Sequence, residues 1–227
     1  MTATADGAAD YAAMAEQLHD QSSVERTTEL VVKLAVDLVG CTSAGVFLRH
    51  GRDRVESAAA TDPLVERADQ LQLECGRGPC LEALGDNEIL VIPDTETDER
   101  FAPWSAQVAE LGLRSVLSLP LFSADDTTGA LNLYDESPEA FGRTAISRMA
   151  VFARHATLAV KAARNESSLR HAIDSRHLIG QAQGILMERF GLGTDQAFAV
   201  LLRYSQDKNL KLRHVAESIV SSRRLPG

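Results

Sequence analysis

Two cysteines five residues apart have the type and spacing that most directly suggest chemistry in this sequence. Cys75 and Cys80 flank the tetrapeptide Gly-Arg-Gly-Pro, and a neighbouring arginine can lower the pKa of a thiol and make it reactive. The spacing C-x4-C has no second pair of metal ligands, which argues against zinc. A small buried thiol is the commonest fate of cysteine. Structural and redox-sensing roles both stay open, and we predict no catalytic residue and no metal site.

Other motifs that carry chemistry are incomplete. Gly76 and Gly78 have no preceding strand and no third glycine, so they do not form a dinucleotide-binding fingerprint, and no Lys-Ser/Thr pair follows to hold phosphate. The six histidines show no H-E-x-x-H spacing, and no serine lies in a nucleophile-elbow pattern. The sequence therefore leaves any cofactor unknown and argues against an enzyme.

Charge is distributed unevenly along the chain. The 227 residues carry a net charge of -9, which for the whole chain speaks against nucleic-acid binding. Residues 165–227, however, contain nine Lys/Arg against six Asp/Glu, whereas residues 1–164 contain 14 against 26. A small basic surface on an otherwise acidic molecule fits nucleic-acid contact, although a solvated helical face is the ordinary alternative.

The first two thirds of the chain show helices inserted between β-hairpins. Helices are expected at 22–40, where Ser22-x-x-Glu25 forms a capping box, at 61–73 after Asp62-Pro63, and at 101–112. Strands are expected at 43–50 and 54–61 around a turn at 50–53, at 88–94, and at 113–122 and 128–135. This order predicts an α+β fold with an antiparallel sheet and flanking helices.

The last quarter of the chain predicts three amphipathic helices and no strand. Apolar residues recur at helical spacing up to Gly191, and a second helix begins with Thr194 as N-cap. Its apolar stripe is Ala197, Phe198, Leu201, Leu202 and Tyr204, and a third short helix carries Leu212, Val215, Ala216 and Ile219. These helices can close on one another into a compact all-α end-piece.

This end-piece resembles the ANTAR domain, the RNA-binding output domain of bacterial transcription antiterminators. The motif positions are Arg176, Ile179, Ala182, Gln183, Gly184, Ile185, Leu186, Met187, Ala197, Phe198, Leu201, Lys211, Leu212, Val215, Ala216 and Ile219. Many members have Lys where this chain has Gln183. The resemblance implies binding of RNA stem-loops, and with the basic residues it gives the candidate contacts Arg176, Ala182, Gln183, Gly184, Arg203, Lys208, Lys211 and Arg213.

The stretch before the end-piece resembles a GAF domain. Its marks are the G-x-G-P-C run at 76–80, the helix ending at Gly112, and the strand R-S-V-L-S-L-P-L paired with G-A-L-N-L-Y. GAF domains are sensory modules, so the resemblance implies a pocket that could hold a small-molecule ligand. Cys80, Phe101 and Trp104 are the candidate ligand-binding residues, with core packing as the alternative.

Residues 144–190 contain no proline and only two glycines, so they predict one continuous or once-broken helix of roughly 70 Å, with a candidate hinge at 165–168. Its apolar residues alternate three and four apart, as in a helix-pairing seam of a homodimer. Packing against the chain's own sheet is the alternative. The seam residues are Ile146, Met149, Ala153, Ala156, Val160 and Ala163.

Together these features predict four segments: an N-terminal segment 1–21, a GAF-like sensor 22–161, an ANTAR-like domain 162–222 and a tail 223–227. We expect a cytoplasmic, homodimeric antitermination regulator of the GAF-ANTAR class, without a membrane span because no run approaches about 20 apolar residues. Two alternatives stay open: a thiol-based redox sensor or methionine sulfoxide reductase-like GAF protein, and a DNA-binding regulator built on a helix-turn-helix.

Overall fold

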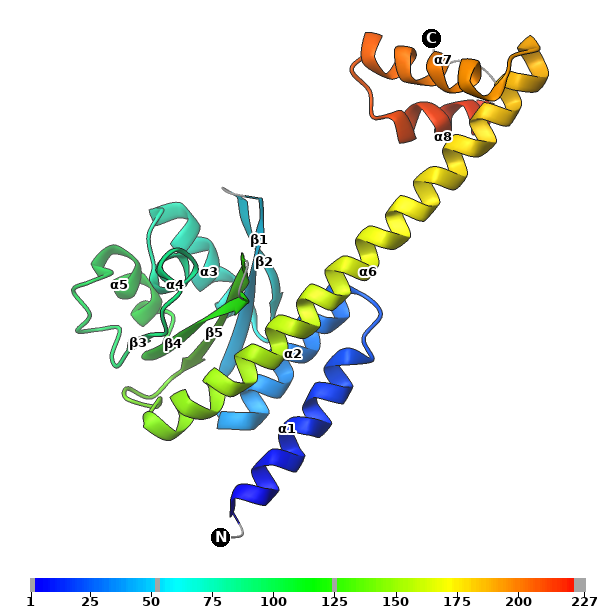
Figure 1. Cartoon of the computed structure of the whole chain (residues 1–227). Coiled ribbons are helices and arrows are strands. Elements are labelled where there is room, and N and C mark those ends of the chain that lie inside the picture. Colours follow the sequence, from blue (N-terminus) through cyan, green and yellow to red (C-terminus); the bar gives the residue numbers. More distant parts are fainter. Residues whose placement is uncertain (1–2, 52–53, 124–125, 223–227) are drawn as a thin grey trace. The chain divides into compact units, whose positions relative to one another are not determined.

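The computed structural model of the chain describes residues 3–51, 54–123 and 126–222 (Figure 1). The chain divides into two compact units, Met1–Asn165 and Glu166–Gly227, which we call the N-terminal and C-terminal units. The sequence placed this boundary after residue 161. Two of the predicted turn residues, Arg52 and Asp53, and the predicted tail 223–227 lie outside the described residues.

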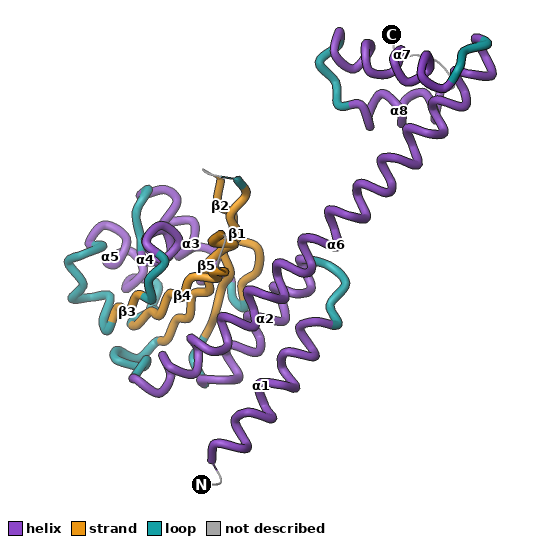
Figure 2. The backbone as a smooth tube through the Cα atoms, in the orientation of Figure 1, coloured by secondary structure: helices purple, strands orange, loops and turns teal. Residues whose placement is uncertain are grey.

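The N-terminal unit is an antiparallel sheet with helices on both faces, as predicted (Figure 2). The sheet has the order β2-β1-β5-β4-β3. Its strands are β1 Ser43–His50, β2 Arg54–Ala60, β3 Leu90–Ile92, β4 Ser115–Ser123 and β5 Asp126–Asp135. The helices that end within this unit are α1 Ala3–His19, α2 Val24–Val39, α3 Pro63–Cys75, α4 Pro79–Asp86 and α5 Ala102–Glu110.

Local sequence explains where several of these helices begin and end. Ser23, not the predicted Ser22, is the N-cap of α2, and its hydroxyl accepts a hydrogen bond from the backbone N–H of Arg26 at 3.3 Å. Asp62 caps α3 in the same way, with Pro63 at the first helical position, which has no partner for an N–H. Gly40 ends α2 with φ 72°, a left-handed conformation that glycine adopts without steric cost.

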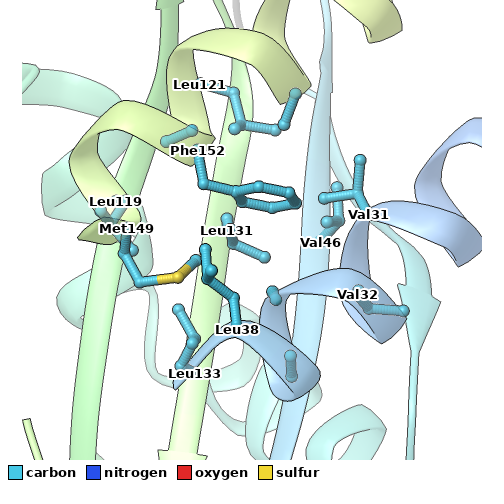
Figure 3. Packing of buried hydrophobic residues seen from close by; sticks show 14 of the residues in the cluster. Val31, Val32, Leu38, Val46, Leu119, Leu121, Leu131, Leu133, Met149 and Phe152 are labelled. Carbon is cyan, nitrogen blue, oxygen red and sulfur yellow. The ribbon is translucent and has the colours of Figure 1, made fainter. Parts of the chain in front are cut away.

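One face of the sheet is covered by α1, α2 and the first part of α6, which spans Arg143–Phe190. Figure 3 shows the packing: the Phe152 ring of α6 lies between Val31 of α2 and the sheet residues Leu121 and Leu131. These side chains are completely buried or nearly so. Burial of apolar side chains holds this helical layer to the sheet at about 25 cal/mol per Å² of apolar surface.

The predicted helix-pairing seam on α6 is wrong. Met149, Ala153, Ala156 and Val160 belong to the hydrophobic core of the N-terminal unit, and Ile146 packs against it. Ala163 is also buried. The alternative of packing against the chain's own sheet therefore holds, because a spacing of three and four residues fits a sheet as well as a second helix. The helix itself is continuous over 48 residues and passes through the candidate hinge at 165–168 without a break.

The C-terminal unit contains the rest of α6 together with α7 Thr194–Asp207 and α8 Leu212–Ser222. Gly191 ends α6 with φ 65°, and Gly193 rather than Thr194 is the N-cap residue of α7. The core of the unit is small and apolar: Ala182, Leu186, Ala197, Leu201, Val215, Ala216 and Ile219. Two members of the predicted stripe on α7, Phe198 and Leu202, are instead 39% and 40% exposed.

Candidate functional site

The sheet face under α3, α4 and α5 carries small or polar side chains at its centre. Gly45 of β1 pairs with Asn132 of β5, and Asn132 pairs with Ser118 of β4. Residues directly opposite on neighbouring strands point to the same face. Apolar clusters flank this row: Phe47, Cys80, Leu84 and Ala130 form one, and the larger one includes Val116 and Tyr134. The face therefore has a polar centre between two apolar margins.

Asp69 of α3 lies over this row and is completely buried. Its Oδ2 accepts a hydrogen bond from the Ser57 hydroxyl at 3.0 Å. Its Oδ1 accepts from the Tyr134 hydroxyl at 3.2 Å and from the Asn132 amide at 3.4 Å. Burial raises the pKa of Asp69 to about 7, although these three donors oppose the shift.

Gln72, one turn after Asp69, connects this group to α4. Its side-chain Oε1 accepts the backbone N–H of Cys80 at 2.8 Å, which gives the start of α4 a cap that Gly78 cannot supply. The Cys80 thiol is completely buried, and burial together with the Asp69 charge raises its pKa well above the ordinary value. Such a thiol stays protonated at neutral pH, which disfavours the thiolate chemistry that a redox or reductase role requires.

Cys75, the last residue of α3, and Arg77, in the loop that follows, both lie at the surface. The Cys75 sulfur is 4.0 Å from the side-chain amide nitrogen of Gln107. Arg77 pairs with Glu82 at 3.5 Å, and its guanidinium carbon is 5.6 Å from the centre of the Phe101 ring. The arginine that could have activated a thiol thus has a carboxylate and an aromatic ring as its partners.

The structure distributes the predicted ligand residues over two clusters. Cys80 packs with Phe47, Leu84 and Ala130. Phe101 and Trp104 belong to the cluster that joins α3 and α5 to the sheet, and the Trp104 indole N–H donates to the backbone oxygen of Ala68 at 2.9 Å. Both aromatic side chains are buried, so they build the wall of this face; contact with a ligand remains a prediction for them.

Sequence reasoning missed the polar residues at the centre of this face. Asp69 and Gln72 share the side of α3 that carries Val65 and Ala68, which are buried. Asn132 alternates with Leu131 and Leu133 in the buried run 129–134, whose other members are glycine, alanine, leucine and tyrosine. A polar residue at a position that the periodicity assigns to the interior is a signal that could have found all three.

The basic residues predicted to contact RNA in the C-terminal unit differ in how exposed their side chains are. Arg176, Arg203, Lys208 and Lys211 are exposed, and Arg213 is half-buried. Lys208 and Lys211 lie in the turn between α7 and α8, with Arg213 in the first turn of α8. Arg203 is 3.8 Å from Asp207, a weak surface pair.

Three further predicted contacts lie on α6. Gly184 is exposed, and an added Cβ would meet no atom within 4 Å, so the surface is open at this position. It lines a surface hollow of about 490 Å³ together with Gln181, Ile185, Glu188 and Val220. Gln183 is half-buried and its amide donates to the backbone oxygen of Thr194 at 3.3 Å. Ala182 is completely buried in the core, which removes it from the candidate contacts.

The N-terminal and C-terminal units each match a known domain family. The model of the GAF domain family matches residues 23–160, more than half of the chain. The chain belongs to this family. The model of the ANTAR domain matches residues 167–220, so the protein has the GAF-ANTAR architecture predicted from its motifs. A GAF sensor joined to an ANTAR domain makes it a signal-regulated ANTAR regulator.

Solved structures agree on the fold of the GAF domain. The GAF domain of Acinetobacter phosphoenolpyruvate-protein phosphotransferase matches with a TM-score of 0.54 and 15% identity, covering 73% of this chain and 96% of that one. The free methionine-R-sulfoxide reductase from Neisseria meningitidis, solved with its substrate, matches with a TM-score of 0.54 and 18% identity, covering 68% and 88%. The cyanobacteriochrome TePixJ GAF domain gives 0.55 and 17%, covering 65% and 94%. At these identities the likeness shows the fold alone.

No curated protein matches the chain. Among the described residues, no helix is long and apolar enough to span a membrane. The same ranges contain no group of three or more His, Cys, Asp and Glu side chains that could hold a metal ion.

Proposed function

We propose that this protein is a transcription antitermination regulator that acts in the cytoplasm. Its ANTAR domain binds structured leader RNA as stem-loops and prevents a terminator hairpin from forming. Its GAF domain controls this binding in response to a small-molecule signal. The observation that carries the proposal is an ANTAR domain with an excess of basic residues, placed on exposed surface, in a chain that is otherwise acidic.

The placement of the basic residues supports RNA as the ligand. Lys208, Lys211 and Arg213 gather around the turn between α7 and α8, while Arg203 lies on α7 and Arg176 on α6. Duplex DNA recognition requires base-reading side chains on one exposed helix. Cations spread over three helices suit phosphate contacts along a folded RNA.

The basic side chains around the turn between α7 and α8 lie outside the core of the ANTAR domain, so they can be replaced without unfolding it. None of the side chains of Lys208, Lys211 and Arg213 belongs to the hydrophobic cluster of the ANTAR domain. Substitutions that neutralise them should therefore act on binding more than on stability. Removal of one phosphate contact should reduce the dependence of log K on log salt concentration by roughly 0.7 to 0.9 of a unit.

The test is a titration of stem-loop RNA and of duplex DNA of matched length with the full chain. We expect tighter binding of the stem-loop, and weaker, less salt-dependent binding when Lys208, Lys211 and Arg213 are all changed to Ala. A matched control changes Arg143, Arg148 and Arg154, three exposed residues of α6 in the GAF domain, and removes the same charge. Equal effects of the two triple variants, or equal affinity for RNA and DNA, would contradict the proposal.

We further propose that the protein acts as a homodimer, through a surface other than the buried seam. In the C-terminal unit, Leu169 and Ile173 lie one turn apart on α6 and are 65% and 66% exposed. Large apolar side chains this exposed, on one face of a helix, suit pairing with the same face of a second copy. A dimer would engage two RNA hairpins at once, and the second contact would gain from an effective concentration on the order of millimolar.

Sedimentation of the full chain tests the dimer. The double variant Leu169→Glu, Ile173→Glu should be monomeric and should lose the preference for two adjacent hairpins over one. Leu210→Glu is the control, because Leu210 is also an exposed apolar residue of the ANTAR domain but lies outside α6. A wild type that sediments as a monomer at micromolar concentration would remove the dimer from the mechanism.

A further inference from the structure

The buried carboxyl group of Asp69 has no cationic partner among the residues that the structure describes. The groups that contact it are the Ser57 hydroxyl, the Tyr134 hydroxyl and the Asn132 amide, all uncharged. Of the ionisable groups around it, Glu66 on α3, Cys80 on α4 and Tyr134 on β5 are all acids. A buried carboxylate that is hydrogen-bonded but unpaired is held in an unfavourable electrostatic environment.

Two more hydrogen-bond acceptors beside Asp69 lack partners. Asn132 uses its Nδ2 to donate to Asp69, and its buried Oδ1 makes no hydrogen bond within the described part of the chain. The buried hydroxyl of Ser118, directly opposite on β4, is also unpartnered there. Side chains opposite one another on neighbouring strands have Cβ atoms about 4.5–5.5 Å apart. Asp69, Asn132 and Ser118 therefore form an acceptor-rich group. Beside it, the buried Nε2 of Gln72 is a donor that also lacks a partner within the described residues.

The sequence places Asp69 here through a glycine on the sheet. A Cβ atom at Gly45 would lie 2.6 Å from Cγ1 of Val65 and 3.2 Å from Oδ2 of Asp69. Any side chain at position 45 would thus push α3 away from the strands. The close approach of α3, and with it the position of the carboxyl group over the central row, depends on this missing side chain.

We propose that this face of the GAF domain binds a small cation with an ammonium or guanidinium group, which pairs with Asp69 and donates hydrogen bonds to Asn132 Oδ1 and Ser118 Oγ. The inference rests on the proposed function, because it assigns the chemical class of the signal that the sensor receives. A donor-rich cation satisfies the two unpartnered oxygens and the carboxylate together. A neutral amide would leave the carboxylate without a counter-charge.

Helix α4 is the segment that covers this group and would have to move when the cation binds. It has eight residues, and Cys80 and Leu84 hold it on Phe47 and Ala130. Its N-cap residue Gly78 has no side chain, so Gln72 Oε1 takes its place by accepting the Cys80 N–H, and this bond helps to anchor the first turn. This cover is small compared with the layer on the opposite face.

Binding of a cation at Asp69 should depend on pH. The pKa of this carboxyl is raised to about 7 by burial, and the cation requires the ionised form. Below this value binding must displace a proton, so affinity should rise up to about tenfold per pH unit between about pH 5 and 7 and level off above. Glu66 is the neighbouring charged group on α3. Cys80 and Tyr134, which face Asp69 from α4 and β5, have pKa values raised well above this window by burial.

Calorimetric or NMR titration of the full chain with methylguanidinium and with methylurea tests the proposal. The two probes have nearly the same shape, and only methylguanidinium is charged. We expect methylguanidinium to bind at least about tenfold more tightly, with the pH dependence given above, and Asp69→Asn to abolish both the binding and the pH dependence. Ser118→Ala should weaken binding several-fold. The matched control is Ser115→Ala on the same strand, whose hydroxyl already donates to the backbone oxygen of Ser137 at 2.8 Å.

Three outcomes would overturn the inference: methylurea binds equally well, the affinity is independent of pH, or neither probe binds at about 10 mM. If Asp69→Asn does not fold, the proposal is still tested by the pH dependence of wild-type binding and by the comparison of Ser118→Ala with Ser115→Ala. Stem-loop binding is measured on the same preparation without probe. A chain that binds the cation but not RNA would contradict the proposed output and leave this inference standing; the reverse result would contradict the inference alone.

Discussion

The GAF and ANTAR domains place their polar groups in opposite ways. All the fully buried polar side chains among the described residues lie in the GAF domain, including Asp69, Gln72, Ser118 and Asn132. The core of the ANTAR domain consists of Ala, Leu, Val and Ile, and its polar and charged residues are at the surface. The difference suits an interior that responds to a small molecule and an exterior that contacts a large one. Four variants test how far this contrast extends.

The largest effect is expected on the apolar face of the GAF sheet. Phe152→Ala should lower the free energy of unfolding by about 3–5 kcal/mol, because the ring is completely buried between α2 and the strands (Figure 3). Leu158→Ala is the control on the same helix, since Leu158 is 63% exposed and should cost under about 1 kcal/mol. Chemical denaturation measures both. Similar losses for the two variants would contradict the packing of α6 on this face.

A smaller loss is expected in the core of the ANTAR domain. Leu201→Ala should cost about 2–4 kcal/mol, whereas the neighbouring Leu202→Ala should cost under about 1 kcal/mol because Leu202 is 40% exposed. Thermal unfolding followed by circular dichroism gives the comparison. If Leu202→Ala is the more damaging change, the helix α7 is rotated from the position described.

The polar interior should make the stability of the GAF domain depend on pH. The pKa of Asp69 is raised by burial from 3.8 to about 7. The contribution of neutral Asp69 to the free energy of unfolding is therefore fully present below about pH 4. It is lost as the pH rises through about 7. Asp69→Asn should remove this loss, which is on the order of 2–4 kcal/mol between about pH 4 and 8.

Denaturation of the wild type and of Asp69→Asn across this pH range is the measurement. Asp94→Asn is a control with the opposite sign, since the hydrogen bonds from Arg114 lower the pKa of Asp94. Compared with the wild type, this variant should be less stable by a constant amount at neutral and alkaline pH. The difference should disappear as the pH falls through the lowered pKa of Asp94. A wild-type stability that is flat between about pH 4 and 8 would show that Asp69 is not held as described.

The smallest stability change is expected on the ANTAR surface, and it separates binding from folding. Gly184→Ala should raise the free energy of unfolding by about 0.5–1 kcal/mol, because alanine favours the helix and its Cβ meets no atom within 4 Å. RNA binding should nevertheless weaken, because the methyl group blocks close approach to the hollow. Gly180→Ala, at an equally open position of α6, should give the same stabilisation with RNA affinity retained. Equal affinities for the two variants would remove Gly184 from the contact surface.

Local signals in the sequence predicted the elements well. Gly40 and Gly191 end helices in the left-handed conformation, Pro63 begins α3, and the two hairpins have the predicted strands. Which partner the apolar side of a helix packs against was harder to predict from the sequence. The residues Met149, Ala153 and Val160 have a spacing that fits a partner helix and the chain's own sheet equally well, and the tertiary packing decides between them. For the same reason Phe198 was assigned to a stripe that is too wide for so small a core.

The candidate site was predicted only in part. The exposed cations of the ANTAR domain follow from charge and motif, because charged side chains need no tertiary contact to be placed at a surface. The group around Asp69 could not be assembled from the sequence, since it joins residues up to 65 positions apart on α3 and β5. Only the register of the strands brings Ser118 beside Asn132.

The edges of the sheet have a consequence for solubility. At one edge β3 is only three residues long and covers Val116–Ser118 of β4, and the next part of β4 contains Pro120, which has no N–H to offer another strand. At the other edge β2 carries Arg54 and Glu56, which pair at 3.1 Å. Short edge strands, proline and charge are the features that keep a sheet from templating strands of neighbouring molecules into aggregates. The GAF domain should therefore remain free of fibrillar association at concentrations where a longer, uncharged edge would not.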